Sequence, residues 1–281
     1  MGISIRVRPA RPEDKQAILS FSRNTFSWGD YIPEVWDKWL GDRAGQIVVG
    51  VVDGQPIAML HVAILEQRVA WMEGMRVHPD FRRQGLGTAV DAGGLEYART
   101  RGCRIARLAT SSKNIPAQRT LRTQGYTQVA QFNSWTAPSA HGDALESRVA
   151  TVDDLAEILA RWNQSEIRNP SHALLPDPYW RWTDLTESRL REQIAANQVR
   201  IVPGGFALCP TFDREKEFYV HALAGDSETV RQLALDARVE AGYRGFEQLE
   251  AMIADDLRVN LPLSNTGYVL EGAMLVYEQT L

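Results

Sequence analysis

The sequence has little cysteine, no metal-ligand spacing and no long apolar run. The only two cysteines, Cys103 and Cys209, exclude a disulfide framework and a cysteine-rich zinc site. The five histidines are scattered, so we expect no metal. No run of about 18 apolar residues is present, which argues against a membrane span. Residues 1–6 lack the apolar core of a secretory signal. We therefore expect a cytoplasmic protein with no membrane partner.

An excess of positive charge is also absent. The formal net charge is -4, which counts against non-specific nucleic-acid binding, so we expect no nucleic-acid partner. The composition is 44% hydrophobic and 23% charged, which is typical of a folded globular chain and unlike a disordered one.

Part of the pattern recurs along the chain. Arg8 and Asp14, followed by Ile-Leu, return 140 residues later as Arg148 and Asp154, again followed by Ile-Leu. Gly125-Tyr126 returns 142 residues later as Gly267-Tyr268. The shared order favours two duplicated domains, which we place at residues 1–137 and 146–281, with a linker near residues 137–146.

The first half alternates between strand-like and helix-like segments. Asp53-Gly54 lies between two apolar runs and predicts a tight hairpin. Strands are predicted at residues 3–8, 46–52, 56–64, 68–77, 103–109 and 126–136, the last of them closing the first half. Helices are predicted at residues 12–24, 32–40, 86–101 and 114–124. The expected class is α/β (α+β), with a mixed twisted sheet flanked by helices in each half.

The segment from Arg82 to Thr88 has the composition of an anion site. It lies between a predicted strand and a predicted helix, and the start of a helix presents unpaired N–H groups and the positive end of its dipole. Gly85 and Gly87 let an anion approach the backbone, and Arg82 and Arg83 add two cations. These features predict a cradle for a diphosphate.

Two common phosphate loops do not fit this segment. No Gly-x-x-x-x-Gly-Lys-[Ser/Thr] run occurs, which excludes a Walker A loop. A dinucleotide fingerprint requires a third glycine where Val90 stands.

The pattern Arg82-x-x-Gly85-x-Gly87 resembles the acyl-CoA pyrophosphate loop of the GCN5-related N-acetyltransferase (GNAT) superfamily. The segment from Asn114 to Ala117, followed by Gly125-Tyr126, resembles the second motif of that family. The resemblance covers about 130 residues of the first half. It implies an N-acetyltransferase that moves an acetyl group from acetyl-CoA to a primary amine of a small molecule or peptide by direct attack.

The resemblance also implies which residues hold the co-substrate. The backbone of the strand before the loop would pair with the pantetheine arm, the loop amides would hold the diphosphate, and Asn114 would contact the arm. The implied cofactor-binding residues are Met75, Arg76, Val77, Arg82, Arg83, Gln84, Gly85, Leu86, Gly87, Thr88, Asn114 and Ala117.

Glu73 is the candidate general base. Strand parity places it on the same face as Val77, and an amine must lose a proton before it attacks a thioester. The alternative is a merely paired carboxylate. The family often carries a tyrosine as general acid where this chain has Leu121. Either Tyr126, another side chain or water takes that role, or the thiolate departs unassisted, or the protein is a poor catalyst.

The second half lacks the features of the loop. Its corresponding segment, residues 224–229, contains Asp226 and Glu228 in place of the arginines and paired glycines, and acidic groups repel a diphosphate. We expect a GNAT-like second domain without a CoA site, serving as a wall for the acceptor groove or as an internal pseudo-dimer partner, in a monomer or a homodimer. The alternative function is a non-catalytic acyl-CoA-binding sensor or interaction module.

Overall fold

The computed structural model describes residues 4–23, 25, 29–142, 145–177, 179–210 and 218–281. Residues 3, 24, 143 and 144, which fall in the predicted elements and linker, lie outside this description. The chain forms two compact units. The first contains Met1–Leu108, Pro116–Thr127 and Tyr277–Leu281, and the second contains Ala109–Ile115 and Gln128–Val276. Neither unit is one continuous segment, and the division at residues 1–137 and 146–281 stays a prediction.

From Arg6 to Thr123 the predicted order of strands and helices is confirmed. The elements are β1 (Arg6–Pro9), α1 (Lys15–Ser22), α2 (Ile32–Leu40), β2 (Gly45–Val52), β3 (Gln55–Leu65), β4 (Val69–Val77), α3 (Leu86–Thr100), β5 (Ile105–Ser111) and α4 (Ile115–Thr123). Three short 3-10 turns join them: η1 (Pro12–Asp14), η2 (Glu66–Arg68) and η3 (Pro79–Phe81). Asp53 and Gly54 both have positive φ, at 48° and 82°, as the tight hairpin between β2 and β3 requires.

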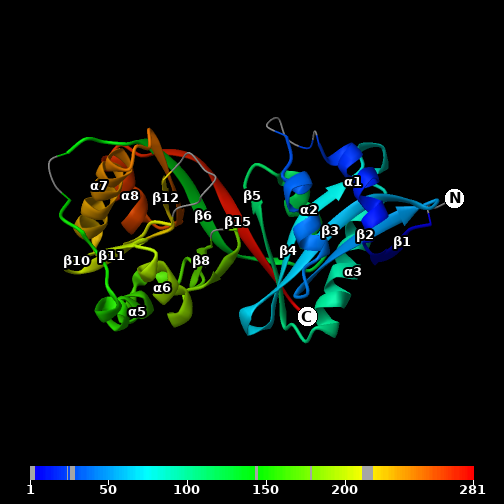
Figure 1. Ribbon diagram of the computed structural model, residues 1–281, viewed down its shortest axis with the longest axis horizontal. Helices are drawn as coiled ribbons and strands as arrows, with labels where there is room; N and C mark the ends of the chain where they lie inside the picture. The colour runs from blue at the N-terminus through cyan, green and yellow to red at the C-terminus, as the bar shows by residue number, and fades with distance from the viewer. Residues whose placement is uncertain (1–3, 24, 26–28, 143–144, 178, 211–217) are drawn as a thin grey trace. The chain divides into compact units, whose positions relative to one another are not determined.

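The sheet of the first unit runs β1-β2-β3-β4-β5, with helices packed against β2 and β3 (Figure 1). Both faces of β2 are buried. Ile47, Val49 and Val51 pack with Trp36 and Ile18 of α2 and α1, and α3 packs against β2, β3 and β4. Alternate side chains of a strand point to opposite faces, so a continuous apolar run is what a strand covered on both sides needs.

Strands β4 and β5 separate after three residue pairs. They pair in parallel only from Val69↔Ile105 to Trp71↔Arg107, whereas β4 pairs with β3 as far as Val77. The backbone of β4 beyond Trp71 therefore has no β5 partner. This splayed strand leads directly into the loop that precedes α3.

A β-bulge in β4 overturns the predicted face of Glu73. Glu73 pairs with His61 and Arg76 pairs with Met59, so Gly74 and Met75 together oppose a single residue of β3. The extra residue reverses the alternation of side chains. Glu73 consequently shares its face with Arg76, and the prediction that it shares a face with Val77 is wrong.

The strand predicted to close the first half pairs elsewhere. β6 (Thr127–Pro138) runs antiparallel to β14 (Gln248–Ala254), and residues 128–138 belong to the second unit. The end of β15 (Val269–Thr280) belongs to the first unit instead. Residues 137–138, predicted to begin the linker, are strand residues paired with Leu249 and Gln248. Local periodicity predicts a strand at residues 126–136 but cannot specify its partner.

The second unit contains two larger sheets. One runs β15-β6-β14-β12, and the other runs β13-β11-β10-β7. Its remaining elements are β7 (Arg148–Val149), α5 (Leu155–Gln164), β8 (Leu174–Pro176), β9 (Trp182–Asp184), α6 (Glu187–Ala195), β10 (Val199–Val202), β11 (Gly205–Leu208), β12 (Phe218–Val220), β13 (Ala222–Ala224), α7 (Ser227–Tyr243) and α8 (Leu257–Asn265), with 3-10 turns η4 (Val152–Asp154) and η5 (Glu166–Arg168). β12 pairs in parallel with β14, whereas β13 pairs with β11, so a splay like that of β4 is present here too.

The repeated Arg–Asp motif has the same geometry in both units. Asp14 accepts hydrogen bonds from Arg8 (2.6 Å) and from the backbone N–H of Arg11 (2.8 Å). Asp154 accepts them from Arg148 (2.7 Å) and from the N–H of Thr151 (2.8 Å). Each aspartate stabilises the turn that starts the first helix of its unit.

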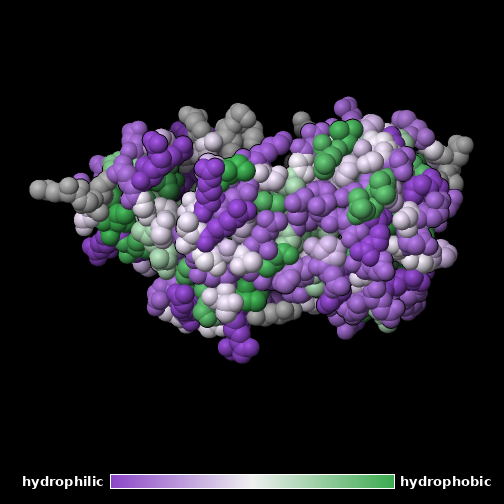
Figure 2. Space-filling view, turned by 180° about the vertical axis from the view of Figure 1, so that it is seen from behind, coloured by the Kyte–Doolittle hydropathy of each residue, from purple (hydrophilic) through white to green (hydrophobic). Residues whose placement is uncertain are grey.

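No helix among the described residues combines the length and apolarity that crossing a membrane demands. Over the face shown in Figure 2, hydrophilic side chains predominate and hydrophobic ones form small separate patches. Both cysteines are buried free thiols.

Candidate functional site

The loop before α3 is a helix start whose amides are available to a ligand. The first helical hydrogen bond runs from the N–H of Ala89 to the carbonyl of Gly85, so the N–H groups of residues 85–88 lie outside the helical ladder. Arg83 and Gly85 both have left-handed backbones, with φ of 61° and 85°. A non-glycine residue in that region costs about 1–3 kcal/mol and is found most often at functional sites.

The space above these amides is open. A Cβ placed on Gly85 would meet no atom within 4 Å, and one on Gly87 would meet only Val77 Cγ2 at 3.9 Å. Glycine at position 85 satisfies the left-handed backbone and leaves the approach to the amides clear. The loop therefore fits an anion that is gripped by backbone N–H groups.

The two arginines of the loop add positive charge. Arg82 and Arg83 are exposed, and among the described residues no carboxylate pairs with either guanidinium. Arg82 lies with Nε 3.4 Å from the carbonyl oxygen of Val77, and Gln84 donates to the carbonyl of Asp80 at 3.1 Å. The charge of both guanidinium groups is thus available to a phosphate.

The strand before the loop offers its backbone rather than its side chains. Met75 and Val77 are partly buried, and Arg76 is buried with its side chain turned to Asp30, at 2.6 Å (Nε–Oδ2) and 3.0 Å (Nη2–Oδ1). Burial raises the pKa of Asp30, but hydrogen bonds from Arg76 and from the N–H of Ile32 outweigh it and leave that pKa below its ordinary value. The Arg76 side chain is therefore committed to an ion pair.

Glu73 forms a pair with a buried histidine. Its Oε1 lies 2.9 Å from Nδ1 of His61, and its side chain is 14% exposed, whereas His61 is fully buried. The His61 ring stacks on Trp39 of α2, with ring centres 4.3 Å apart and an angle of 8° between planes. Glu73 is thus both paired and partly accessible, so the role of general base and the role of a paired carboxylate are compatible with each other.

Tyr31 lies close to the same group. Its ring lies 5.1 Å from the Arg76 guanidinium carbon. Burial raises the pKa of Tyr31, the charge of Arg76 lowers it, and the charge of Glu73 raises it again. Asp30, Tyr31, Glu73 and Arg76, with His61 beneath, form a polar cluster on the face of β4 that the α1 and α2 helices cover.

The second predicted motif lies around α4. Asn114 is exposed just before the helix, with Nδ2 3.4 Å from Oγ1 of Thr110, and Ala117 is partly buried in its first turn. Asn114 belongs to the second unit and Ala117 to the first, so the structure does not bring all of the predicted cofactor residues together in one unit.

Neither Leu121, which replaces the family's tyrosine, nor Tyr126 offers an available hydroxyl as general acid. Leu121 is buried in α4. The Tyr126 hydroxyl is buried and bonds Asp91 Oδ1 at 3.1 Å. Burial is the largest cause that raises the pKa of Tyr126, and the charge of Asp91 raises it further. Tyr126 is therefore a core residue, and the suggestion that it protonates a leaving thiolate is wrong.

The corresponding helix start in the second unit is capped by its own chain. Asp226 is the N-cap of α7, and its Oδ1 accepts the N–H of Thr229 at 2.8 Å. That hydrogen bond lowers the pKa of Asp226. A carboxylate therefore occupies the place that the loop before α3 leaves open.

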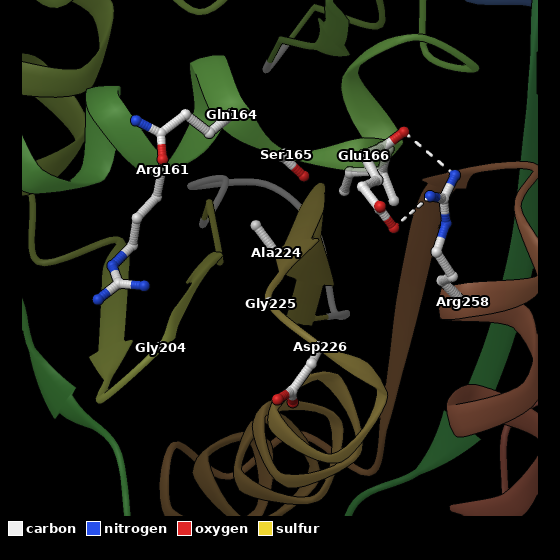
Figure 3. A pocket seen from close by; sticks show the side chains of 10 residues that line it. Arg161, Gln164, Ser165, Glu166, Gly204, Ala224, Gly225, Asp226 and Arg258 are labelled. Atoms are coloured by element: carbon white, nitrogen blue, oxygen red, sulfur yellow. Dashed lines mark hydrogen bonds and ion pairs between the residues drawn. The ribbon is translucent and has the colours of Figure 1, made fainter.

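A cavity of about 300 Å³ lies beside this capped helix (Figure 3). Arg258 of α8 pairs with Glu166 in the lining of the cavity, and Arg258 also pairs with Asp256 at 2.7 Å. Arg161 pairs with Glu157 at 2.8 Å. Both arginines lining the cavity are thus already neutralised by carboxylates, unlike Arg82 and Arg83.

Comparisons with known proteins agree with this geometry. Residues 15–126 match the model of the Acetyltransferase (GNAT) family. A GCN5-related N-acetyltransferase from Sphaerobacter thermophilus superposes on 98% of this chain and 95% of its own, with a TM-score of 0.68 and 16% identity. One from Kribbella flavida covers 99% and 71%, with a TM-score of 0.57 and 18% identity. At these identities the structures show the fold alone.

Two curated relatives align with the chain in sequence. An aminoglycoside N(6')-acetyltransferase type 1 from Klebsiella aerogenes is 27% identical over 151 residues, which cover 49% of this chain and 99% of the relative. A histidine N-acetyltransferase from Xenopus tropicalis is 24% identical over 123 residues, or 41% of this chain and 38% of the relative. The chain thus spans well under two thirds of the Xenopus protein.

These matches connect residues 15–126 with the Acetyltransferase (GNAT) family and the chain with the fold of GCN5-related N-acetyltransferases. Proteins of this fold bind acetyl-CoA, the acetyl donor. The open amides and the two arginines without carboxylate partners fit the diphosphate of that donor.

The residues that sequence reasoning missed are Asp30, Tyr31, Trp39 and His61. The one sequence signal for the position of His61 is the Asp53-Gly54 hairpin. It fixes the register of β2 against β3 but not that of β3 against β4. The pairing of His61 with Glu73 depends on the bulge at residues 74–75, so the alternation of side chains along a regular strand does not predict it.

Proposed function

We propose that this protein transfers an acetyl group from acetyl-CoA to a primary amine of a small molecule or peptide. The observation that carries the proposal is the loop from Arg82 to Thr88, whose open amides and guanidinium groups without carboxylate partners fit a diphosphate. The names of the relatives agree, since histidine and aminoglycosides both carry amines.

The proposed co-substrate site follows the splayed strand into the loop. The backbone of residues 75–77 lies beyond the pairing of β4 with β5 and would pair with the amides of the pantetheine arm. Amides 83–88 and the guanidinium of Arg82 would hold the diphosphate, with Ala117 of the same unit at the arm. Acetyl-CoA supplies an acetyl group already activated as a thioester.

Glu73 is the proposed general base. A protonated amine has no lone pair, so an N–H bond must break and the proton must move to an acceptor before the amine nitrogen can form a bond to carbon. The Glu73 carboxylate is part-exposed and can accept that proton directly or through one water. The nitrogen then forms the C–N bond and loses its second proton to solvent, the C–S bond breaks, and the thiolate leaves. With Leu121 and Tyr126 buried, solvent is the proposed proton source for the thiolate.

We further propose that the second unit is a GNAT-like domain that has lost its CoA site. The shared Arg–Asp motif and the whole-chain superposition support a duplicated fold. The Asp226 cap and the neutralised arginines support the loss.

Two measurements test the proposal. Isothermal titration with acetyl-CoA is expected to give micromolar binding at one site, weakened at least about tenfold in the double variant Arg82→Ala/Arg83→Ala, since each hydrogen bond to a charged group contributes about 1.5–3 kcal/mol. Mass spectrometry of a broad amine library incubated with acetyl-CoA is expected to detect acetylated product.

The outcomes separate the candidate functions. Binding with no product from any amine would favour a non-catalytic acyl-CoA sensor. No binding at all would end the proposal. The matched control Arg161→Ala changes an arginine of the second-unit cavity and should leave the affinity for acetyl-CoA unchanged.

A further inference from the structure

His61 is a fully buried histidine whose imidazole is directed at one carboxylate. It lies directly opposite Glu73 in the antiparallel pairing of β3 and β4, and its Nδ1 is 2.9 Å from Glu73 Oε1. A carboxylate only accepts hydrogen bonds, so Nδ1 carries the proton and donates it.

The other nitrogen of the His61 ring, Nε2, does not bond a described carboxylate as Nδ1 does. Nε2 of His61 is buried, and within the described part of the chain it has no hydrogen-bond partner. A buried polar atom without a partner is costly, and an apolar residue at this position would avoid that cost. The hydrogen bond to Glu73 is therefore the one polar contact that explains a histidine here.

Close packing fixes the ring in this orientation. One face stacks on Trp39 at 4.3 Å. A Cβ on Gly45 would lie 2.8 Å from Nε2 of His61, and one on Gly74 would lie 2.7 Å from the Trp39 ring. Both glycines thus let the backbone close around the two rings, which leaves the imidazole little freedom to turn.

We infer that His61 is a positioning residue for Glu73, an inference that rests on the proposed function for its catalytic meaning. The Nδ1–H group holds Oε1 and stabilises the ionised carboxylate, so that the carboxylate keeps one orientation when it takes the proton of the acceptor amine. His61 itself gains and loses no proton in this step. Preorganisation of the base by a buried neighbour is how a partly exposed carboxylate keeps one orientation.

The charged and titratable groups around Glu73 set the direction of the expected change. Among the described residues they include His61 on β3, Arg76 on β4, and Asp30 and Tyr31 before α2. A hydrogen bond to the charged form of an acid lowers its pKa, so removal of the His61 bond raises the pKa of Glu73. The titration midpoint of Glu73 should move up by about one pH unit, the scale of one charged hydrogen bond.

The test is a titration of the Glu73 side chain that needs no turnover. The protein is labelled with glutamate that carries 13C at the side-chain carboxyl carbon, and the Glu73 signal is assigned as the one missing in Glu73→Gln. Its chemical shift is followed against pH in the wild type, in His61→Leu and in His61→Asn. The asparagine amide can place an N–H donor near the position of Nδ1, and it is expected to recover part of the shift seen with leucine.

The control is a second buried histidine. His221 is 1% exposed, and its Nδ1 lies 3.1 Å from the backbone carbonyl of Pro176 rather than from a carboxylate. His221→Leu should leave the Glu73 midpoint where it is. Circular dichroism and thermal unfolding establish that each variant is folded before its titration is read.

The result expected is a raised Glu73 midpoint in His61→Leu and a smaller rise in His61→Asn. The acid limb of the pH profile of kcat/KM should shift by the same amount as the midpoint in each variant. An unchanged midpoint in folded His61→Leu overturns the inference, as does an equal rise in His221→Leu. A raised midpoint in a protein that acetylates no amine would keep the His61–Glu73 coupling and remove the proposed function instead.

Discussion

Arg107 donates from Nε to Oε1 of Glu278 at 2.7 Å, which joins β5 to a residue 171 positions later in the chain. Both groups are largely buried, with side-chain exposures of 6% and 14%. The last residue, Leu281, donates its N–H to the carbonyl of Arg104 at 3.0 Å. The sheet that carries the loop before α3 is therefore completed by residues 277–281.

Loss of this carboxylate should destabilise the first unit. Removing one partner of a buried ion pair costs about 3–5 kcal/mol, since the remaining charge stays buried. Glu278→Ala is expected to lower the free energy of unfolding by about 3 kcal/mol in urea denaturation. The control Glu187→Ala breaks an exposed pair with Arg191 and should cost under about 1 kcal/mol. Equal losses in both variants would contradict the structural role given to Glu278.

Removal of residues 277–281 is a stronger form of the same change. Tyr277 is fully buried, so its removal should leave a large cavity in the first unit as well as an incomplete sheet. Acetyl-CoA binding measured by titration is expected to disappear in the chain that ends at residue 276. Full binding by that shortened chain would show that the loop before α3 does not depend on the terminal strand.

Sequence patterns predict most of the first unit because its signals are local. The Asp53-Gly54 turn, the apolar run of β2 and the glycines of the loop each act over a few residues. The partner of β6 is a long-range choice that no local pattern contains, and so the sequence alone closes the first half with the wrong strand. The face of Glu73 is predicted wrongly for a different reason. One extra residue at the bulge reverses the alternation of side chains on which the prediction rests.

The cradle before α3 can be tested by copying the cap of α7 into it. Gly85 is the N-cap of α3 as Asp226 is the N-cap of α7. Gly85→Asp would place a carboxylate over the amides, where it competes with the diphosphate and repels it. We expect its affinity for acetyl-CoA to fall by about 100-fold, with binding measured by titration.

The matched variant is Gly85→Asn, which has the same shape and the same tolerance of a left-handed backbone without the charge. It should bind acetyl-CoA more tightly than Gly85→Asp by at least about tenfold. If the two variants weaken binding equally, strain or bulk rather than charge controls the site.

Glu73→Gln should separate chemistry from binding. The amide keeps the size of the side chain but cannot accept the proton of the acceptor amine, so kcat is expected to fall by about 10²–10⁴, the usual contribution of a general base. The KM for acetyl-CoA should change little, because no part of the proposed base contacts the diphosphate. Glu66→Gln, an exposed carboxylate in η2, is the control and should retain full kcat. A Glu73→Gln enzyme with normal kcat would leave Glu73 a purely structural carboxylate.

Asp91 should make the stability of the protein fall as the pH rises from about 4 to 6. Its burial raises the pKa of the carboxyl from 3.8 to about 6, and the hydrogen bond with Tyr126 offsets only part of that rise. Because the folded pKa lies above the unfolded one, the stabilising contribution is fully present below about pH 4 and is lost as the pH passes through 6. A shift of about two units corresponds to about 3 kcal/mol.

Asp91→Asn keeps an acceptor for Tyr126 and cannot ionise, so it should exceed the wild type in unfolding free energy at pH 8 and lose that advantage at pH 4. Urea denaturation at pH 4 and pH 8 measures the difference in unfolding free energy. The control is Asp80→Asn, which changes an exposed aspartate. If the pH dependence of the wild type persists in Asp91→Asn, other carboxyl groups cause it.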